Sequence, residues 1–233
     1  MKKILLVLTV ALIANLLFAV GAFASTTDLN TIPIPQTKEL GQWEWDLRVF
    51  LNDDIEKGRF FSNALYGVVW DKLEVGFDWN INRPIGPFKM GAKYQVWDEI
   101  RDGDVIGLAI GVENIQGTKG RGMDDPQPYI VISKQLNPNI AGYFGVIQYD
   151  SEDVNFFAGA DWKNEVWQFR VDYLGFDENN ERIVSGGIEY QWVKHVDLAG
   201  WLSWNSVSED TTIVLELGFD ADFTDITKDG GSV

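Results

Sequence analysis

The sequence predicts an all-β protein, a single antiparallel transmembrane β-barrel of about 12 strands with up-and-down topology. Three observations predict this fold class. Apolar and polar residues alternate with a period of two along most of the chain, long and short connections alternate, and aromatic residues gather near the expected strand ends. The chain has 233 residues, which is enough for one barrel and too few for two large domains.

The first element is a predicted signal peptide over residues 1–24. Lys2 and Lys3 form a positive start, an almost unbroken apolar stretch covers residues 4–20, and an A-x-A cleavage site ends at Ala24, before Ser25. A retained single membrane anchor is the alternative, because the apolar stretch approaches spanning length. The small residues around the cleavage site favour removal and therefore export.

An extended periplasmic leader is expected over residues 25–40, because this stretch is polar and is stiffened by Pro33 and Pro35. The barrel is expected over residues 41–220, and an acidic tail over residues 221–233. Within the barrel, strands with one apolar and one polar face are expected at 43–51, 72–79, 88–96, 106–113, 155–163, 167–173, 184–192, 196–204 and 212–219. Three less regular segments, 61–70, 128–134 and 141–149, complete the strands.

The connections support the same fold, because outer-membrane barrels have short periplasmic turns and longer outer loops. If the first strand runs outward, the outer loops fall at 52–60, 81–87, 114–127, 150–154, 174–182 and 205–211. The inner turns fall at 71–72, 97–104, 135–140, 163–165 and 193–195. Segments 97–104 and 150–154 break the length trend, and both chain ends are placed on the inner side.

The charged residues on the polar strand faces are the candidate lumen lining. Both signs are present, so these charges can pair across the interior and fill it, or line a narrow wet channel for small polar solutes. Much of the acidic excess falls in loops and in the tail, including Asp220, Asp222, Asp225 and Asp229, and disfavours anionic solutes. The lumen candidates are Glu44, Asp46, Arg48, Lys72, Glu74, Asp78, Lys89, Lys93, Glu113, Asp161, Lys163, Arg170, Asp172, Glu189, Asp197 and Glu216.

Aromatic residues near the strand ends predict two membrane-interface girdles. The inner girdle comprises Trp43, Trp45, Trp70, Trp162, Tyr190, Trp192 and Phe219. The outer girdle comprises Trp79, Phe88, Tyr149, Tyr173 and Trp204. Partition of these rings into a lipid interface requires the apolar face of each strand to point outward.

Composition and motifs exclude several functions. The chain has no cysteine, and its 35 acids against 19 bases give a formal charge of −16, which argues against nucleic-acid binding. Its one histidine, His195, lies in a predicted inner turn and is expected to be solvated rather than catalytic. We expect no enzyme activity, catalytic residue, metal or cofactor. Weak Ca²⁺ binding by loop acids is the less favoured alternative to ordinary acidic loops, at Asp124, Asp125, Asp150, Glu152 and Asp153.

Residues 105–134 carry a resemblance to a known family. The stretch VIGLAIGVENIQGT over residues 105–118, followed by YIVISK over residues 129–134, resembles a repeated hairpin of the YjbH-like outer-membrane β-barrel proteins. The resemblance implies an outer-membrane barrel associated with secreted exopolysaccharide. It covers about thirty residues of this chain.

Taken together, these features predict an outer-membrane barrel whose partners are lipid and either a polysaccharide or a small polar solute. It is expected to act as a narrow pore or as an accessory of exopolysaccharide export. The first alternative is a non-conducting structural or surface-interaction barrel. The second is a soluble periplasmic β protein that binds an apolar ligand inside, because alternation alone does not decide which face meets water.

Overall fold

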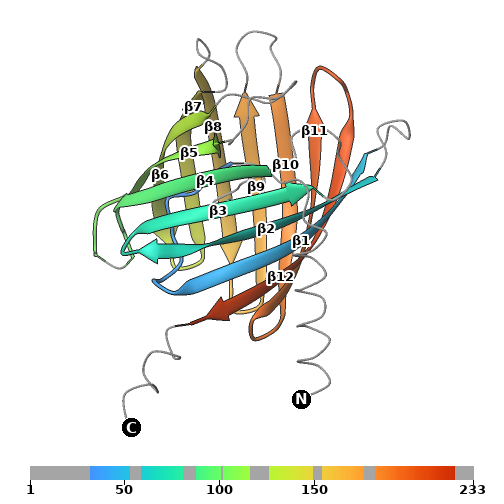
Figure 1. Ribbon diagram of the computed structural model, residues 1–233. Coiled ribbons are helices and arrows are strands. Elements are labelled where there is room, and N and C mark those ends of the chain that lie inside the picture. Colours follow the sequence, from blue (N-terminus) through green and yellow to red (C-terminus); the bar gives the residue numbers. More distant parts are fainter. Residues whose placement is uncertain are drawn as a thin grey trace, which may run out of the picture.

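The computed structural model describes residues 32–52, 59–80, 88–100, 102–115, 126–148, 154–175 and 182–223. These residues form twelve strands that close into one antiparallel barrel, which confirms the predicted fold class (Figure 1). The predicted signal peptide, residues 25–31 of the leader and residues 224–233 of the acidic tail lie outside the described residues. No helix among the described residues is long and apolar enough to cross a membrane.

The strands follow the predicted order along the chain. They are β1 (Gln42–Asn52), β2 (Arg59–Trp70), β3 (Leu73–Asn80), β4 (Phe88–Trp97), β5 (Gly107–Ile115), β6 (Gln127–Asn137), β7 (Ile140–Gln148), β8 (Val154–Lys163), β9 (Trp167–Gly175), β10 (Arg182–Val193), β11 (Val196–Asn205) and β12 (Thr211–Asp222). β12 therefore extends two residues into the segment assigned to the tail.

The barrel closes through β1, which pairs with β2 on one side and with β12 on the other. The closing register runs from Gln42↔Asp222 to Asn52↔Thr212 without a bulge. Closure removes the open edges that a sheet of this size would otherwise present. It also gives the backbone of β1 hydrogen-bond partners on both sides.

Connections are tight at one end of the barrel. β2 and β3 are joined by residues 71–72, and β10 and β11 by residues 194–195. Asp71 and His195 take left-handed backbone conformations in these turns, with φ of 43° and 71°. The link between β4 and β5 is longer, as the sequence indicated for 97–104, and the amides of Asp102 and Asp104 both donate to the Asp98 carbonyl.

The strands present an apolar outer face and a mainly polar inner face. β6 shows the pattern most clearly, because exposed and buried residues alternate from Gln127 to Lys134. On the outer face, Leu215 is 51% exposed and Phe156 is 58% exposed, whereas Asp46, Glu74 and Lys93 on the inner face are fully buried. A soluble barrel with an apolar interior would show the opposite arrangement.

Candidate functional site

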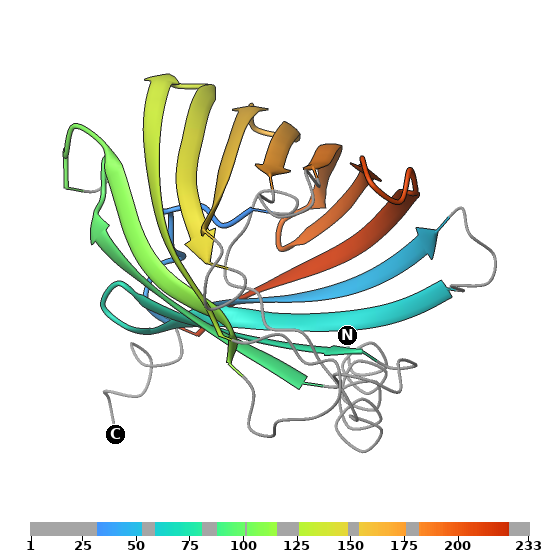
Figure 2. The ribbon, with the colours of Figure 1, turned by 90° about the horizontal axis from the view of Figure 1, so that it is seen from above.

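The barrel interior contains a segment of the chain itself. Residues 32–40, here called the inner segment, precede β1 and cross the space enclosed by the strands (Figure 2). Its first four residues are buried, and Ile32 is fully inaccessible. The sequence predicts an extended periplasmic leader here. In the structure residues 32–35 are buried inside the barrel, residues 36–38 are partly buried, and Glu39 and Leu40 are exposed.

One half of the interior holds the inner segment by apolar contact. Ile32 and Ile34 belong to a buried cluster with inward side chains of β5–β9, here called the apolar wall: Ala109, Tyr129, Val131, Ala141, Tyr143, Ile147, Phe157 and Leu174. Glycines make room for its rings. A Cβ added at Gly145 would collide with the Phe157 ring, and one added at Gly111 would collide with the Tyr129 ring. Burial of this kind is the largest favourable term available to the segment.

Polar contacts hold the middle of the segment. Lys93 donates from Nζ to the carbonyl oxygen of Gln36 at 2.7 Å and also pairs with Glu74 at 3.1 Å. The Gln36 amide donates to Ser133 Oγ at 3.1 Å, and Thr37 Oγ1 donates to Gln95 Oε1 at 2.9 Å. Lys93, Glu74 and Gln95 come from neighbouring strands, so these contacts fix the position of the segment across the lumen.

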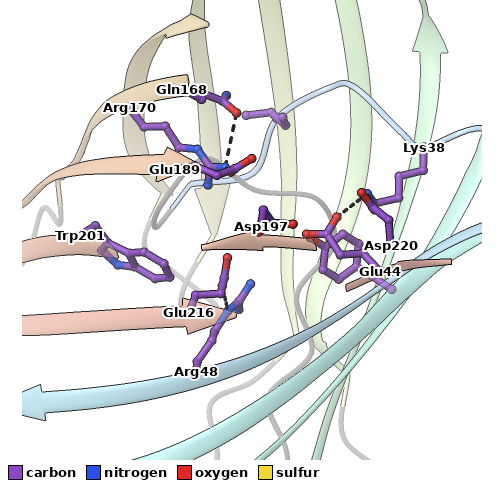
Figure 3. A pocket seen from close by; sticks show the side chains of 12 residues that line it. Lys38, Glu44, Arg48, Gln168, Arg170, Glu189, Asp197, Trp201, Glu216 and Asp220 are labelled. Carbon is purple, nitrogen blue, oxygen red and sulfur yellow. Dashed lines mark hydrogen bonds and ion pairs between the residues drawn. The ribbon is translucent and has the colours of Figure 1, made fainter. Parts of the chain in front are cut away.

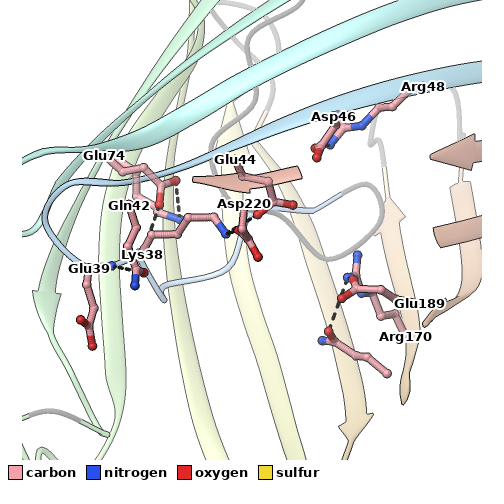
Figure 4. Close-up of polar contacts among 12 residues, drawn as sticks. Lys38, Glu39, Gln42, Glu44, Asp46, Arg48, Glu74, Arg170, Glu189 and Asp220 are labelled. Carbon is pink, nitrogen blue, oxygen red and sulfur yellow. Dashed lines mark hydrogen bonds and ion pairs between the residues drawn. The ribbon is translucent and has the colours of Figure 1, made fainter. Parts of the chain in front are cut away.

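The end of the segment meets carboxylates. Lys38 Nζ forms ion pairs with Glu44 and, at 2.8 Å, with Asp220, and it lies 5.7 Å from the centre of the Tyr66 ring (Figure 4). Its backbone amide donates to Glu74 Oε2 at 3.4 Å. Burial by itself lowers the pKa of the Lys38 ammonium, but the two carboxylates outweigh it and hold that pKa above its ordinary value.

Further carboxylates lie on the same side of the interior. Together Glu44 and Asp46 on β1, Asp197 on β11, and Glu216 and Asp220 on β12 are here called the acid wall. Arg48 pairs with Glu216 and, at 2.8 Å, with Asp46, and its guanidinium lies 6.0 Å from the Trp201 ring centre. Gly218 lies opposite both Asp46 and Asp197, and an added Cβ there would meet the Asp197 carboxylate.

A second polar group lies on β8–β10. Arg170 forms an ion pair with Glu189 and donates to Gln168 Oε1 at 3.4 Å. Gln168 in turn donates to Asp161 Oδ2 at 2.6 Å, and Tyr143 donates its hydroxyl hydrogen to Asp161 Oδ1 at 3.1 Å. This network joins the charged lining to the edge of the apolar wall.

A cavity of about 210 Å³ lies between these groups and the inner segment (Figure 3). Its lining has five carboxylates and three cationic side chains, so it carries an excess of negative charge. One indole, that of Trp201, also faces the cavity. The lining residues are Ile34, Lys38, Glu44, Arg48, Tyr66, Gln168, Arg170, Glu189, Asp197, Trp201, Glu216 and Asp220.

The predicted lumen residues divide by location. Glu44, Arg48, Arg170, Glu189, Asp197 and Glu216 line this cavity. Asp46, Glu74, Asp78, Lys89, Lys93, Asp161 and Asp172 are buried elsewhere, while Lys72 and Glu113 are partly buried. Lys163 is exposed, because it ends β8 at the tight turn end of the barrel.

Several residues around the cavity lay outside the predicted lumen set. Trp201 shares a strand face with Asp197, so the alternation contains the signal that locates it. Asp220 is assigned from sequence to the acidic excess of loops and tail, yet it pairs with Lys38. Lys38 and Ile34 precede the strands, and no periodicity marks them as interior residues.

The predicted girdle residues lie mainly on the outer face. Trp70, Trp162, Tyr173, Trp192 and Trp204 are exposed, and Trp43, Trp45, Trp79, Tyr190 and Phe219 are partly exposed. Trp45 stacks on Phe219 with ring centres 5.5 Å apart. The Phe88 side chain and Tyr149 lie outside the described residues.

Other candidate chemistry is sparse in the described chain. His195 is exposed in the turn between β10 and β11. The loop acids that are the candidates for weak Ca²⁺ binding lie outside the described residues. They are Asp124, Asp125, Asp150, Glu152 and Asp153. Within the described ranges, no group of three or more His, Cys, Asp or Glu side chains is placed to hold a metal ion.

Comparison with known proteins gives structural matches only. No protein-family model and no curated protein matches this chain. KdgM porin is similar in fold, with a TM-score of 0.58 at 11% identity over 76% of this chain and 98% of that chain. A KdgM porin in complex with disordered oligogalacturonate has a TM-score of 0.56 with the same identity and coverage. A variant of Rh. blastica porin has a TM-score of 0.44 over 70% of this chain and 55% of that chain. The likeness to KdgM porin shows a porin-like barrel fold.

Proposed function

We propose that this chain is an outer-membrane β-barrel that acts as a narrow pore for small polar or saccharide solutes. The observation that carries the proposal is the orientation of the barrel, with exposed apolar side chains outside and a charged cavity inside. The apolar outer surface suits contact with a lipid bilayer, and the charged cavity suits contact with water. The fold likeness to KdgM porin supports the same function.

The choice of a saccharide as the solute class rests on a solved structure with a similar fold. One KdgM porin is described in complex with disordered oligogalacturonate, an acidic sugar polymer. Here the cavity carries more carboxylates than cations, which favours neutral or cationic solutes over such an acid. An accessory role in exopolysaccharide export rests on the resemblance over residues 105–134 alone and stays a prediction.

Planar-bilayer recording and liposome swelling test the pore. We expect small single-channel conductance with cation preference, and faster swelling in glucose than in galacturonate. Purified protein should need detergent and show heat-modifiable gel mobility, as expected of a closed membrane barrel. Anion preference, or equal uptake of both sugars, would contradict the charge argument.

A non-conducting structural barrel is the second candidate, and the inner segment is the observation that favours it. Ile32 and Ile34 are packed on the apolar wall, and Lys38 is paired on the acid wall, so the segment reduces the open cross-section. An absence of conductance in a protein with normal heat-modifiable mobility would favour this candidate.

A further inference from the structure

The surroundings of Lys38 have the composition of an ammonium-binding site. Two carboxylates, those of Glu44 and Asp220, contact Nζ, and the Tyr66 ring faces it at 5.7 Å. Carboxylates supply charge-assisted acceptors, and an aromatic face attracts a cation through its quadrupole. Lys38 itself comes from the inner segment, not from the barrel wall (Figure 4).

The same site opens onto unfilled space. The cavity of about 210 Å³ is lined by Lys38, Glu44 and Asp220 and continues to Asp197 and Glu216. On the same wall, Asp46 is fully buried, and its Oδ1 has no hydrogen-bond partner among the described residues. Asp46 itself does not line the cavity, but the lining includes two acid-wall carboxylates, those of Asp197 and Glu216, beyond the two that pair with Lys38. There is therefore room and negative charge beside Lys38 for a small cationic body.

We propose that the acid wall is a binding site for a primary ammonium group, that Lys38 is its tethered occupant, and that an amino sugar competes with Lys38 for it. The inference deepens the proposed pore function and rests on that function for any role in transport. Ammonium binding by the wall does not itself require conduction.

Displacement of Lys38 from the acid wall by an amino sugar has a defined structural consequence. The apolar contacts of Ile32 and Ile34 do not involve the acid wall, so they persist when Lys38 is displaced. Lys93 and Ser133 still hold Gln36. The part of the segment that leaves the lining therefore begins after Gln36, and it includes residue 37 once the Thr37 hydrogen bond to Gln95 is removed by substitution. A neutral sugar has no charge to replace that of Lys38, so it leaves the ion pairs in place.

A single cysteine reports this change, because the natural chain has none. Thr37→Cys is placed beside Lys38, and its labelling by a small charged maleimide is followed in purified, detergent-solubilised full-length protein. We expect D-glucosamine to raise the labelling rate about tenfold in a saturable manner, and D-glucose at equal concentration to leave it unchanged.

Variants of the site give the matched tests in the Thr37→Cys background. Lys38→Gln is expected to raise the basal rate and to lower the glucosamine concentration needed for half-maximal binding in calorimetry, because the competitor is gone. Glu44→Gln combined with Asp220→Asn is expected to raise the basal rate and to abolish the glucosamine response. Glu209→Gln makes the same chemical change at an exposed loop position and is expected to change nothing.

The outcomes separate this inference from the pore proposal. A glucosamine response in a barrel that does not conduct supports the ammonium site and contradicts the pore. Conduction with equal responses to glucosamine and glucose, or with no response to either, overturns the ammonium site and leaves the pore intact. Calorimetry on the unmodified protein guards against a misfolded variant, since absence of glucosamine binding there also overturns the inference.

Discussion

The two sides of the barrel interior hold the inner segment through different kinds of interaction. The apolar wall buries Ile32 and Ile34 among aliphatic and aromatic side chains, where contact is insensitive to salt. The acid wall holds Lys38 through ion pairs beside a cavity that admits water, where salt and competing cations weaken the attraction. The first wall therefore anchors the segment, whereas the second holds it through ion pairs that salt can weaken.

Loss of the anchor should have the largest effect. Replacing Ile32 and Ile34 together by Asp removes about 2 kcal/mol of apolar burial per side chain and places charge against the apolar wall. The segment should leave the lumen, and single-channel conductance should rise roughly twofold or more. Val207→Asp, which adds one carboxylate at an exposed loop position, should leave conductance unchanged. Equal conductance in all three proteins would mean that the segment does not restrict the channel.

A neighbouring pair of phenylalanines sharpens the contrast between the inside and the outside of one strand. Phe157 is fully buried on the apolar wall, whereas Phe156 is 58% exposed on the outer face of β8. Phe157→Ala should lower the free energy of unfolding by about 3 kcal/mol, because it leaves a cavity over Gly145. Phe156→Ala should cost much less in detergent. Urea titration followed by gel mobility measures both, and similar losses would place the two rings in similar surroundings.

On the acid wall, Arg48 offers the corresponding test. Arg48→Met keeps an unbranched apolar stem but leaves the Asp46 and Glu216 carboxylates without their shared cation. The free energy of unfolding should fall by about 2 kcal/mol, less than for a fully dry pair because the cavity supplies water. Cation preference should increase, and this increase should be measured as a larger reversal potential in a KCl gradient. An unchanged potential would separate the acid wall from the path of the ions.

Regular alternation made the barrel predictable from sequence. Strand 127–137 shows why, because each residue from Gln127 to Lys134 changes face and the buried and exposed sets follow the pleat. The same rule assigns Asp46, Glu74 and Asp161 to the inner face, where the structure buries them. The same rule also places Trp201 on the inner face, because it lies an even number of positions after Asp197 in the same strand.

The inner segment was not predictable in this way. Residues 32–40 contain two prolines and no strand periodicity, so composition indicates an extended chain but not where that chain lies. Its position depends on contacts with residues far along the sequence, such as Lys38 with Asp220 and Gln36 with Ser133. Pairings of this range are set by barrel closure, which brings β12 beside β1, and no local pattern encodes them.

The smallest effect is expected where a charge lies outside both walls. Lys134, on the outer face of β6 near the turn end, pairs with Glu99 and donates to the carbonyl oxygen of Val105 at 2.5 Å, yet it is about half exposed. Lys134→Met should lower the free energy of unfolding by less than about 1 kcal/mol, because water already competes for the ammonium. Conductance and ion preference should stay as in the natural protein when recorded alongside Arg48→Met. If Lys134→Met shifted the reversal potential as much as Arg48→Met does, total charge rather than its position on the acid wall would control selectivity, and the distinction between the two walls would lose its functional meaning.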